Sequence, residues 1–239
     1  MKPPSQRPRL LITRPADEAE RTAEAARQAG FEPVSAPLLL VEPLPHQLPG
    51  GHPDALLFTS PRAPKVLAGL VNALAALPCY TVGPATAQAA RRAGFTVKGE
   101  GAGDGNAAVE LVAREGHHRI LHPRGEDHVS LTVPDGVELL GFPVYRARAI
   151  PELPAGVVSQ LAASEIFAAL LLSPRTAGLF ADLIARAGVP RAAVRLITLS
   201  PNVSAAAGSG WRAQEVAEAP RLDAAFAAAR RLWQGDGHG

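Results

Sequence analysis

The strongest constraint on the fold is a pair of short turn sequences that occurs once in each half of the chain. The first reads Phe-Thr-Ser-Pro-Arg-Ala at 58–63 and Leu-Ser-Pro-Arg-Thr-Ala at 172–177. The second reads Val-Gly-Pro-Ala-Thr-Ala at 82–87 and Leu-Ser-Pro-Asn-Val-Ser at 199–204. Each copy follows an apolar run and precedes a helix-like stretch. Repeats in the same order predict two similar halves, with a ligand cleft between them.

Short apolar runs alternate with helix-like stretches along the whole chain. We expect strands at 9–13, 32–34, 55–58, 80–82, 119–122, 167–172 and 196–199. We expect helices at 16–29, 62–77, 86–93, 109–114, 177–187 and 222–232. This alternation is typical of parallel sheets covered by helices on both faces. The predicted fold class is therefore α/β, with two similar doubly wound, flavodoxin-like sheets of about five strands each.

Two extended segments bounded by proline, 37–45 and 143–151, interrupt this rhythm. Proline disfavours both helices and central strands, so we expect each segment to be a tether between domains. If the two tethers pair side by side as a two-stranded linker, residues 44–144 form an inner α/β domain. The outer α/β domain is then discontinuous and consists of residues 1–38 and 151–239.

Composition and charge exclude several classes of protein. Cys79 is the only cysteine, so an internal disulfide is impossible and a reducing, cytoplasmic location is expected. The first apolar run, 10–12, is far too short for a signal peptide or a membrane span, so no membrane partner is expected. The net charge is +2 and the arginines are dispersed, which argues against nucleic acid and leaves a small polyanionic ligand.

A Ser or Thr before a proline at a strand-to-helix junction is first of all a helix cap. The hydroxyl accepts a hydrogen bond from a free backbone N–H, and proline suits the first helical position. The turns that fit this pattern have their capping residue at Thr13, Ser60, Gly83, Ser173 and Ser200. Capping alone is enough to explain any one of them.

Several such turns together point to a ligand. The carboxyl ends of parallel strands share one edge of a sheet, and ligands bind at that edge. Helix N-termini there present free N–H groups and the positive end of the helix dipole, which favour anions. Arg14, Arg62, Arg124 and Arg175 add positive charge close to the turns. The turns therefore predict a small acidic ligand.

Five phrases make the chain resemble the uroporphyrinogen-III synthase family. They are Leu-Ile-Thr-Arg-Pro at 11–15, Leu-Leu-Phe-Thr-Ser-Pro-Arg-Ala at 56–63, Val-Gly-Pro-Ala-Thr-Ala at 82–87, Pro-Val-Tyr-Arg at 143–146 and Leu-Leu-Ser-Pro-Arg-Thr-Ala at 171–177. Their order and spacing, together with the paired linkers, extend the resemblance over nearly the whole chain. The chain departs from the family at 200–204, where a Gly-Pro-Thr-Thr-Ala-like phrase is usual and Val203 has no hydroxyl.

The resemblance implies two α/β domains joined by a two-stranded ladder, and a lyase of tetrapyrrole (haem) biosynthesis. Family members take the linear tetrapyrrole hydroxymethylbilane, expel its terminal hydroxyl as water and invert the last pyrrole ring through a spiro intermediate. The macrocycle then closes as uroporphyrinogen III. The resemblance also implies no cofactor and no metal, and catalysis by positioning with help from a proton donor. We further expect a monomer that makes a transient contact with the preceding pathway enzyme.

The resemblance makes Tyr145 the expected catalytic residue, as a phenol that protonates or orients the departing hydroxyl. The alternative for Tyr145 is a linker tyrosine that packs its ring and hydrates its hydroxyl. Turn positions that match the family are Ser60, Thr86, Arg124, Gly125 and Ser173. With the capping and charge arguments, the predicted substrate-binding residues are Arg14, Thr59, Ser60, Gly83, Pro84, Thr86, Arg124, Gly125, Ser173 and Ser200. Because the inner copy of the second turn is intact, we expect that turn, with Thr86, to bind the substrate more tightly.

Two further signals receive structural interpretations. The glycine-rich stretch 99–105 comes late in the inner domain, so a mobile loop over the cleft is favoured over a dinucleotide site. His117, His118 and His122 cluster around one strand without cysteine or aspartate, so solvated surface histidines are favoured over a metal site. A non-catalytic, two-lobed anion-binding or regulatory module is the alternative function, and a nucleotide-dependent enzyme is a third.

Overall fold

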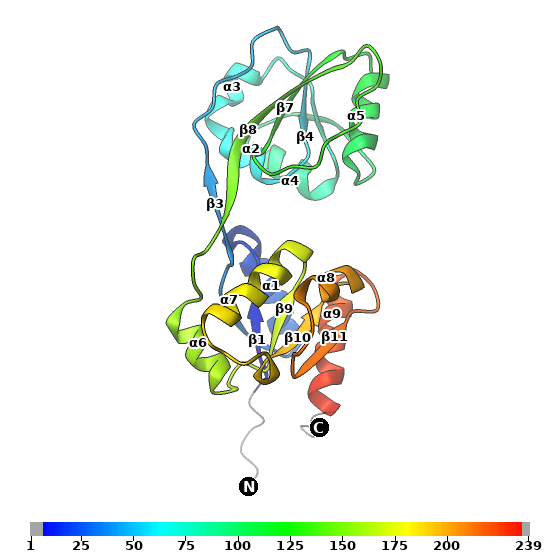
Figure 1. Ribbon diagram of the computed structural model, residues 1–239. Coiled ribbons are helices and arrows are strands. Elements are labelled where there is room, and N and C mark those ends of the chain that lie inside the picture. Colours follow the sequence, from blue (N-terminus) through cyan, green and yellow to red (C-terminus); the bar gives the residue numbers. More distant parts are fainter. Residues whose placement is uncertain (1–6, 236–239) are drawn as a thin grey trace. The chain divides into compact units, whose positions relative to one another are not determined.

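The structure is a computed structural model that describes residues 7–235. The chain divides into two compact units, which Figure 1 colours along the sequence. The central unit is Val41–Ala147, and the terminal unit combines Met1–Leu40 with Arg148–Gly239. Each unit has a sheet, helices and hydrophobic clusters of its own, so the two are described one at a time.

The terminal unit is built on a five-stranded sheet in the order β11-β10-β9-β1-β2. Every neighbouring pair in it is parallel. The strands are β1 (Arg9–Ile12), β2 (Glu32–Ser35), β9 (Ala168–Leu171), β10 (Arg195–Thr198) and β11 (Ala213–Val216). The three middle strands are buried nearly throughout, because parallel strands in the middle of a sheet are covered on both faces.

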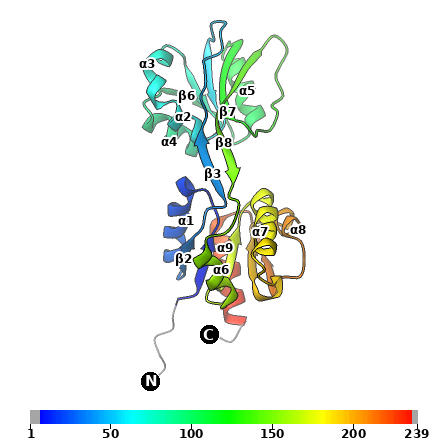
Figure 2. The ribbon, with the colours of Figure 1, turned by 60° about the vertical axis from the view of Figure 1, so that its left-hand side comes forward.

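Helices pack on both faces of this sheet. They are α1 (Ala16–Gln28), α6 (Ala155–Ala162), α7 (Pro174–Arg186), η2 (Arg191–Ala193), α8 (Pro201–Ala207) and α9 (Leu222–Trp233). α6, α7 and α8 pack around Phe180 on one face, while α1 and α9 pack around Phe31 and Phe226 on the other. Figure 2 shows α1 and α7 on opposite sides of the sheet. The prediction of an α/β fold with parallel sheets and helices on both faces is confirmed for this unit.

The central unit has a six-stranded sheet in the order β3-β8-β7-β4-β5-β6. The strands are β3 (Leu39–Pro43), β4 (Ala55–Phe58), β5 (Cys79–Thr81), β6 (Val97–Glu100), β7 (Arg119–Gly125) and β8 (Glu138–Ala149). The pairs from β8 through β7, β4 and β5 to β6 are all parallel. Their carboxyl ends therefore lie along one edge of the sheet.

The helices of the central unit are α2 (Arg62–Val66), η1 (Ala68–Leu70), α3 (Val71–Leu74), α4 (Pro84–Arg92) and α5 (Gly105–Arg114). α2, α3 and α4 pack on the face that carries Phe58, and α5 packs on the face that carries Tyr80. Figure 2 shows these two groups on opposite sides of the sheet. The predicted single helix 62–77 is wrong, because a 3-10 turn at η1 divides it. Gly69 lies in that turn, and glycine weakens a continuous α-helix.

β8 continues through a proline. It is 12 residues long and includes Pro143, which has no N–H to donate to a neighbouring strand. The register of β8 against β7 shifts at this point, between the pairs Arg124–Pro143 and Gly125–Tyr145. The irregularity lets the strand pass the proline and sets Tyr145 opposite Gly125. Backbone hydrogen bonds from Leu44 N to Val144 O (2.9 Å) and from Ile150 N to Leu38 O (3.0 Å) join the two proline-bounded segments.

The capping predictions hold at some turns and fail at Thr13 and Ser60, since the capping position of α2 is Pro61 rather than Ser60. Ser173 Oγ accepts from Thr176 N, and Ser200 Oγ accepts from Val203 N, so these two caps are confirmed. Thr13 instead donates its hydroxyl to the Leu170 carbonyl oxygen of β9 at 2.9 Å, and α1 begins only after Pro15. The prediction of a cap at Thr13 is therefore wrong, because a buried hydroxyl next to a neighbouring strand finds its acceptor there.

Candidate functional site

The carboxyl edge of the central sheet carries a cavity of about 580 Å³. Its walls come from the turns after β4 and β5, the stretch that leads into α5, the end of β7 with the loop after it, and part of β8. β4, β7 and β8 are parallel neighbours, so the ends of these strands bring distant parts of the sequence together. Of the predicted site residues, those that line the cavity are Thr59, Ser60, Arg124, Gly125 and Tyr145.

One wall contains a hydrogen-bonded pair, Thr59 and His122. The Thr59 hydroxyl oxygen lies 2.9 Å from His122 Nε2. His122 is only 3% exposed, so the prediction of a solvated surface histidine is wrong at this position. The reason is the place of β7 in the sheet: it lies between β4 and β8, and both of its faces are covered.

Burial also determines the charge of this histidine. Burial first, and then the nearby charges of Arg124 and His128, lower the pKa of His122 from 6.5 to about 4. The buried imidazolium loses its hydration, and a neighbouring guanidinium repels it. His122 is therefore neutral near pH 7, with one ring nitrogen that donates and one that accepts.

Tyr145 forms the wall opposite the end of β7. Tyr145 is 9% exposed, and its ring packs in the same apolar cluster as Phe58 and Phe142. Gly125 faces it across the strand pair, and a Cβ on Gly125 would lie 3.0 Å from ring atoms Cε2 and Cζ of Tyr145. Glycine is therefore required for the Tyr145 ring to approach the end of β7.

This close approach gives a direct prediction for Gly125→Ala. The added methyl group would lie 3.0 Å from the Tyr145 ring and 3.0 Å from the Asp127 carbonyl oxygen, so the ring must move. We expect turnover to fall and the free energy of unfolding to drop by roughly 1–3 kcal/mol, as is usual when a packed site is overfilled. Steady-state kinetics and chemical denaturation measure both effects.

Gly69→Ala is the matched control for Gly125→Ala. Around Gly69, nothing in the described part of the chain lies within 4 Å of an added Cβ. Its turnover should equal that of the unchanged protein. Equal turnover in the Gly125 variant as well would contradict a requirement for the observed position of the Tyr145 ring.

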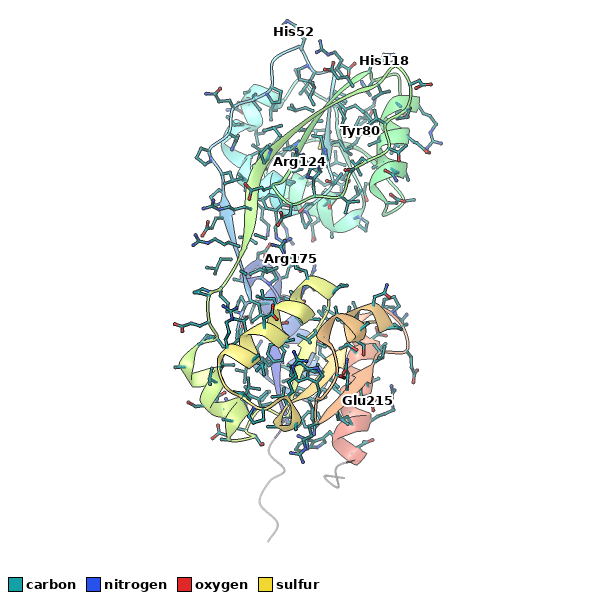
Figure 3. The ribbon with its side chains drawn as sticks, in the orientation of Figure 1. His52, Tyr80, His118, Arg124, Arg175 and Glu215 are labelled. Atoms are coloured by element: carbon teal, nitrogen blue, oxygen red, sulfur yellow. The ribbon has the colours of Figure 1, made fainter. Side chains whose placement is uncertain are left out.

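Arg124 supplies the positive charge of the cavity. Its Nη1 donates to the Gly125 carbonyl oxygen at 3.1 Å and to His128 Nδ1 at 3.0 Å. A Cβ on Gly141 of β8 would lie 3.1 Å from Arg124 Nε, so the guanidinium passes close to the β8 backbone. Figure 3 labels this side chain at the carboxyl end of β7, with His118 just before the other end of the strand. The cavity is of mixed charge, because Asp104 and Asp127 also line it.

The glycine-rich stretch 99–105 forms one side of the site, and packing explains its composition. Gly101 N donates to Thr81 O and Gly103 N to Val82 O, both at 2.7 Å, which joins the stretch to the end of β5. A Cβ on Gly101 would lie 3.0 Å from Ala108 Cβ, and one on Gly105 would lie 2.6 Å from Leu131 Cδ2. These close approaches account for Gly101 and Gly105, which the sequence alone assigned to a mobile loop.

Two polar residues at the start of α5, Asp104 and Asn106, were not predicted from the sequence. Asp104 caps α5 by accepting a hydrogen bond from Asn106 N at 2.8 Å. Asn106 Oδ1 in turn accepts from Thr132 N at 2.8 Å, which attaches the following loop to the start of α5. Both residues line the cavity. The Asp-Gly-Asn sequence before the helix was an available capping signal, but the contact with Thr132 had none.

Of the second turn of the central unit, 82–87, only Val82 lines the cavity among the described residues. Gly83 precedes α4 as its capping residue, and Pro84 takes the first helical position as predicted. Thr86 is buried at 3% exposure. None of these three residues is among the described residues that line the cavity.

The predicted residues of the terminal unit follow three adjacent strands. Arg14 follows β1, Ser173 follows β9 and Ser200 follows β10, at the carboxyl edge of that sheet. Arg14 forms an ion pair with Glu18 of α1, and the hydroxyls of Ser173 and Ser200 cap α7 and α8. Figure 3 labels Arg175 in the first turn of α7. The edge therefore combines helix N-termini with arginines, as the sequence predicted.

The sequence of the chain matches one family over most of its length. The family model described as "Uroporphyrinogen-III synthase HemD" matches residues 20–227. The chain belongs to the uroporphyrinogen-III synthase family. A search of curated proteins finds no match.

Solved structures of uroporphyrinogen-III synthases have a similar fold. The uroporphyrinogen-III synthetase of Helicobacter pylori matches with a TM-score of 0.57 and 16% identity, over 94% of this chain and 99% of that chain. A mutant uroporphyrinogen III synthase of Thermus thermophilus matches with a TM-score of 0.52 and 16% identity, over 95% and 99% of the two chains. At this identity the likeness concerns the fold alone.

Membership in the uroporphyrinogen-III synthase family establishes the activity. The chain is a cyclising lyase of porphyrin and haem biosynthesis that acts on hydroxymethylbilane and forms uroporphyrinogen III with loss of water. The family match gives no support to the alternative of a non-catalytic binding module.

Three further observations describe the chemistry around the site. Burial raises the pKa of the Cys79 thiol to about 12, so this residue supplies no thiolate near neutral pH. Among residues 7–235, no group of three or more His, Cys, Asp or Glu side chains is arranged to hold a metal ion. Over the same residues, no helix has the length and apolar character that crossing a membrane requires.

Proposed function

We propose that the cavity of the central unit is where the uroporphyrinogen-III synthase reaction of this chain takes place, with Tyr145 as its catalytic residue. The proposal rests on one observation: Tyr145, Arg124 and Thr59 all line the same cavity, so a phenol, a guanidinium and a hydroxyl are available at a single site. A phenol can donate the proton with which a hydroxyl group leaves as water, and the other two groups suit the carboxylates of a tetrapyrrole.

In the proposed step, the Tyr145 phenol gives its proton to the terminal hydroxyl of hydroxymethylbilane. The carbon–oxygen bond then breaks, and its electron pair leaves with water. Closure of the macrocycle later releases a proton from a pyrrole carbon, and the phenolate takes it back. The substrate loses its hydroxyl readily, so the larger task of the protein is to hold the chain folded with its last ring inverted.

We propose that the remaining predicted residues bind carboxylates of the substrate at the two sheet edges. Ser60, Gly125, Ser173 and Ser200 belong to turns at the carboxyl ends of strands. Arg14 adds a cation at one of these turns, next to Glu18. Gly83, Pro84 and Thr86 begin α4, and since Thr86 is buried, the contribution of that turn comes from backbone N–H groups and the helix dipole.

We also propose that the enzyme acts as a cytoplasmic monomer that contacts the preceding pathway enzyme transiently. A chain with one buried cysteine is compatible with a reducing compartment. Hydroxymethylbilane also cyclises without an enzyme, to the type I isomer, so a direct transfer between enzymes would protect it. Sedimentation of the protein alone tests whether it is a monomer, and sedimentation with that enzyme tests the contact.

The activity is tested with enzymatically generated hydroxymethylbilane. The products are oxidised to the corresponding porphyrins and the type I and type III isomers are separated by chromatography. We expect the type III isomer in excess, at a rate that increases with enzyme concentration. Type I alone, formed at the rate seen without the protein, would overturn the proposed function.

A further inference from the structure

The pair formed by Thr59 and His122 has no counterpart in the other copy of the turn. In the repeated sequence, Ser60 corresponds to Ser173 and Thr59 corresponds to Leu172, which has no hydroxyl. In the central copy the capping position of α2 is Pro61, and Ser60 Oγ accepts a hydrogen bond from Arg62 N at 3.3 Å. Thr59 is therefore not needed as a cap, and its hydroxyl is available for another purpose.

That hydroxyl lies beside a buried imidazole at the wall of the cavity. Thr59 and His122 both line the cavity, and 2.9 Å separates the hydroxyl oxygen from His122 Nε2. The half-buried Thr59 comes from the end of β4, and the buried His122 from the neighbouring strand β7. The contact between the two side chains thus lies at the wall of the cavity, with the histidine as its buried partner.

The direction of this hydrogen bond decides what Thr59 offers to a ligand. A neutral imidazole either donates from Nε2 or accepts there, according to its tautomer. If Nε2 accepts, the hydroxyl hydrogen is used within the protein. If Nε2–H donates to Thr59 Oγ1, the hydroxyl hydrogen is left for a ligand. A carboxylate only accepts hydrogen bonds, so it selects the second arrangement, and the two bonds in series strengthen each other.

We infer that His122 is a positioning residue that holds the Thr59 hydroxyl as a hydrogen-bond donor to a carboxylate of the tetrapyrrole substrate. The inference rests on the proposed function of this cavity. His122 acts through Thr59 rather than as an acid, since a neutral imidazole has no second proton to give to the departing hydroxyl. The nearby positive charge of Arg124, which also lines the cavity, favours the same carboxylate.

The test compares two amide substitutions, His122→Gln and His122→Asn. The Gln amide nitrogen lies about as far along the side chain as Nε2 of histidine, so it reaches Thr59, whereas the Asn amide ends near the position of Nδ1. Both variants keep a polar side chain in the same strand, and thermal unfolding verifies that each is folded. We expect the KM for hydroxymethylbilane to rise on the order of tenfold in His122→Asn. In His122→Gln it should stay within about twofold of the unchanged enzyme.

A double-mutant cycle with Thr59→Val distinguishes positioning from a purely structural role. Valine keeps the shape of threonine and removes the hydroxyl, so His122→Asn should not change KM further in that background. The inference is overturned if Asn and Gln raise KM equally, or if His122→Asn has the same effect with and without the Thr59 hydroxyl. In either case the unchanged enzyme still forms the type III isomer. Absence of type III from the unchanged protein would instead reject the proposed function itself, and this inference with it.

Discussion

Tyr145→Phe is expected to lower turnover on the order of a hundredfold, which is the usual scale for loss of a proton donor. Only the phenolic oxygen is removed. The ring remains packed with Phe58 and Phe142 and opposite Gly125, so the free energy of unfolding should stay within about 1 kcal/mol of its original value. Initial rates of type III formation and urea denaturation measure the two quantities on the same preparation.

The chain offers a matched control, because it has only two tyrosines. Tyr80 is buried on the other face of the central sheet, and its hydroxyl lies 3.1 Å from His117 Nε2, away from the cavity lining. Tyr80→Phe should cost about 1 kcal/mol of stability for the lost hydrogen bond and leave turnover unchanged. If Tyr145→Phe loses stability and each folded molecule keeps its turnover, Tyr145 is a packing residue.

The fold could be predicted where burial leaves a clear pattern in the sequence. The run 55–58 consists of four apolar residues and predicts a buried strand. The structure has a strand with these bounds, β4, and all four residues are buried. β6 (Val97–Glu100) and β11 (Ala213–Val216) were missed because edge strands are only partly buried and keep a polar composition. α6 (Ala155–Ala162) was missed because a helix that contains Gly156 and Ser159 has a weak local signal.

The site could be predicted only as far as strand ends define it. Thr59 and Arg124 follow from the rule that the carboxyl ends of parallel strands share an edge. The resemblance to the family supplied Tyr145. His122 was misjudged because its burial depends on the neighbours of β7, which the local sequence does not contain. The contact of Asn106 with Thr132 could not be foreseen either, since it joins a helix start to a loop 26 positions away.

The unequal copies of the turns now have a physical reason. In the terminal unit, the Ser173 hydroxyl is hydrogen-bonded to both the backbone N–H and the hydroxyl of Thr176. In the central unit, the Ser60 hydroxyl accepts a hydrogen bond from Arg62 N at the start of α2, and the Thr59 hydroxyl is hydrogen-bonded to His122 at the cavity. The sequence predicts the tighter binding of substrate at Thr86, but the Thr86 side chain is buried and is not among the described residues that line the cavity. We propose Thr59, which lines the cavity, for that part of the binding.

Stability should depend on pH through His122, and the sign follows from its pKa. The folded-state pKa is about 4 and the value in the unfolded chain is about 6.5. Between these values the unfolded chain binds a proton that the folded protein does not, so the free energy of unfolding decreases as the pH falls from about 6.5 to about 4. The contribution of the His122 titration to the free energy of unfolding is fully present above about pH 6.5. Its loss amounts to up to about 3 kcal/mol, since each pKa unit corresponds to about 1.4 kcal/mol.

Denaturation curves recorded from pH 7.5 to pH 4 test this dependence by difference. Other groups titrate over the same range, so the unchanged protein is compared with His122→Gln, which keeps a donor for Thr59 but cannot be protonated. The free energy of unfolding of the unchanged protein should decrease relative to that of His122→Gln as the pH falls, because only the unchanged protein has to keep a buried imidazole neutral in acid. His118→Gln, which changes an exposed histidine just before the same strand, should follow the curve of the unchanged protein. Parallel curves for His122→Gln and the unchanged protein would show that burial does not shift the titration of His122.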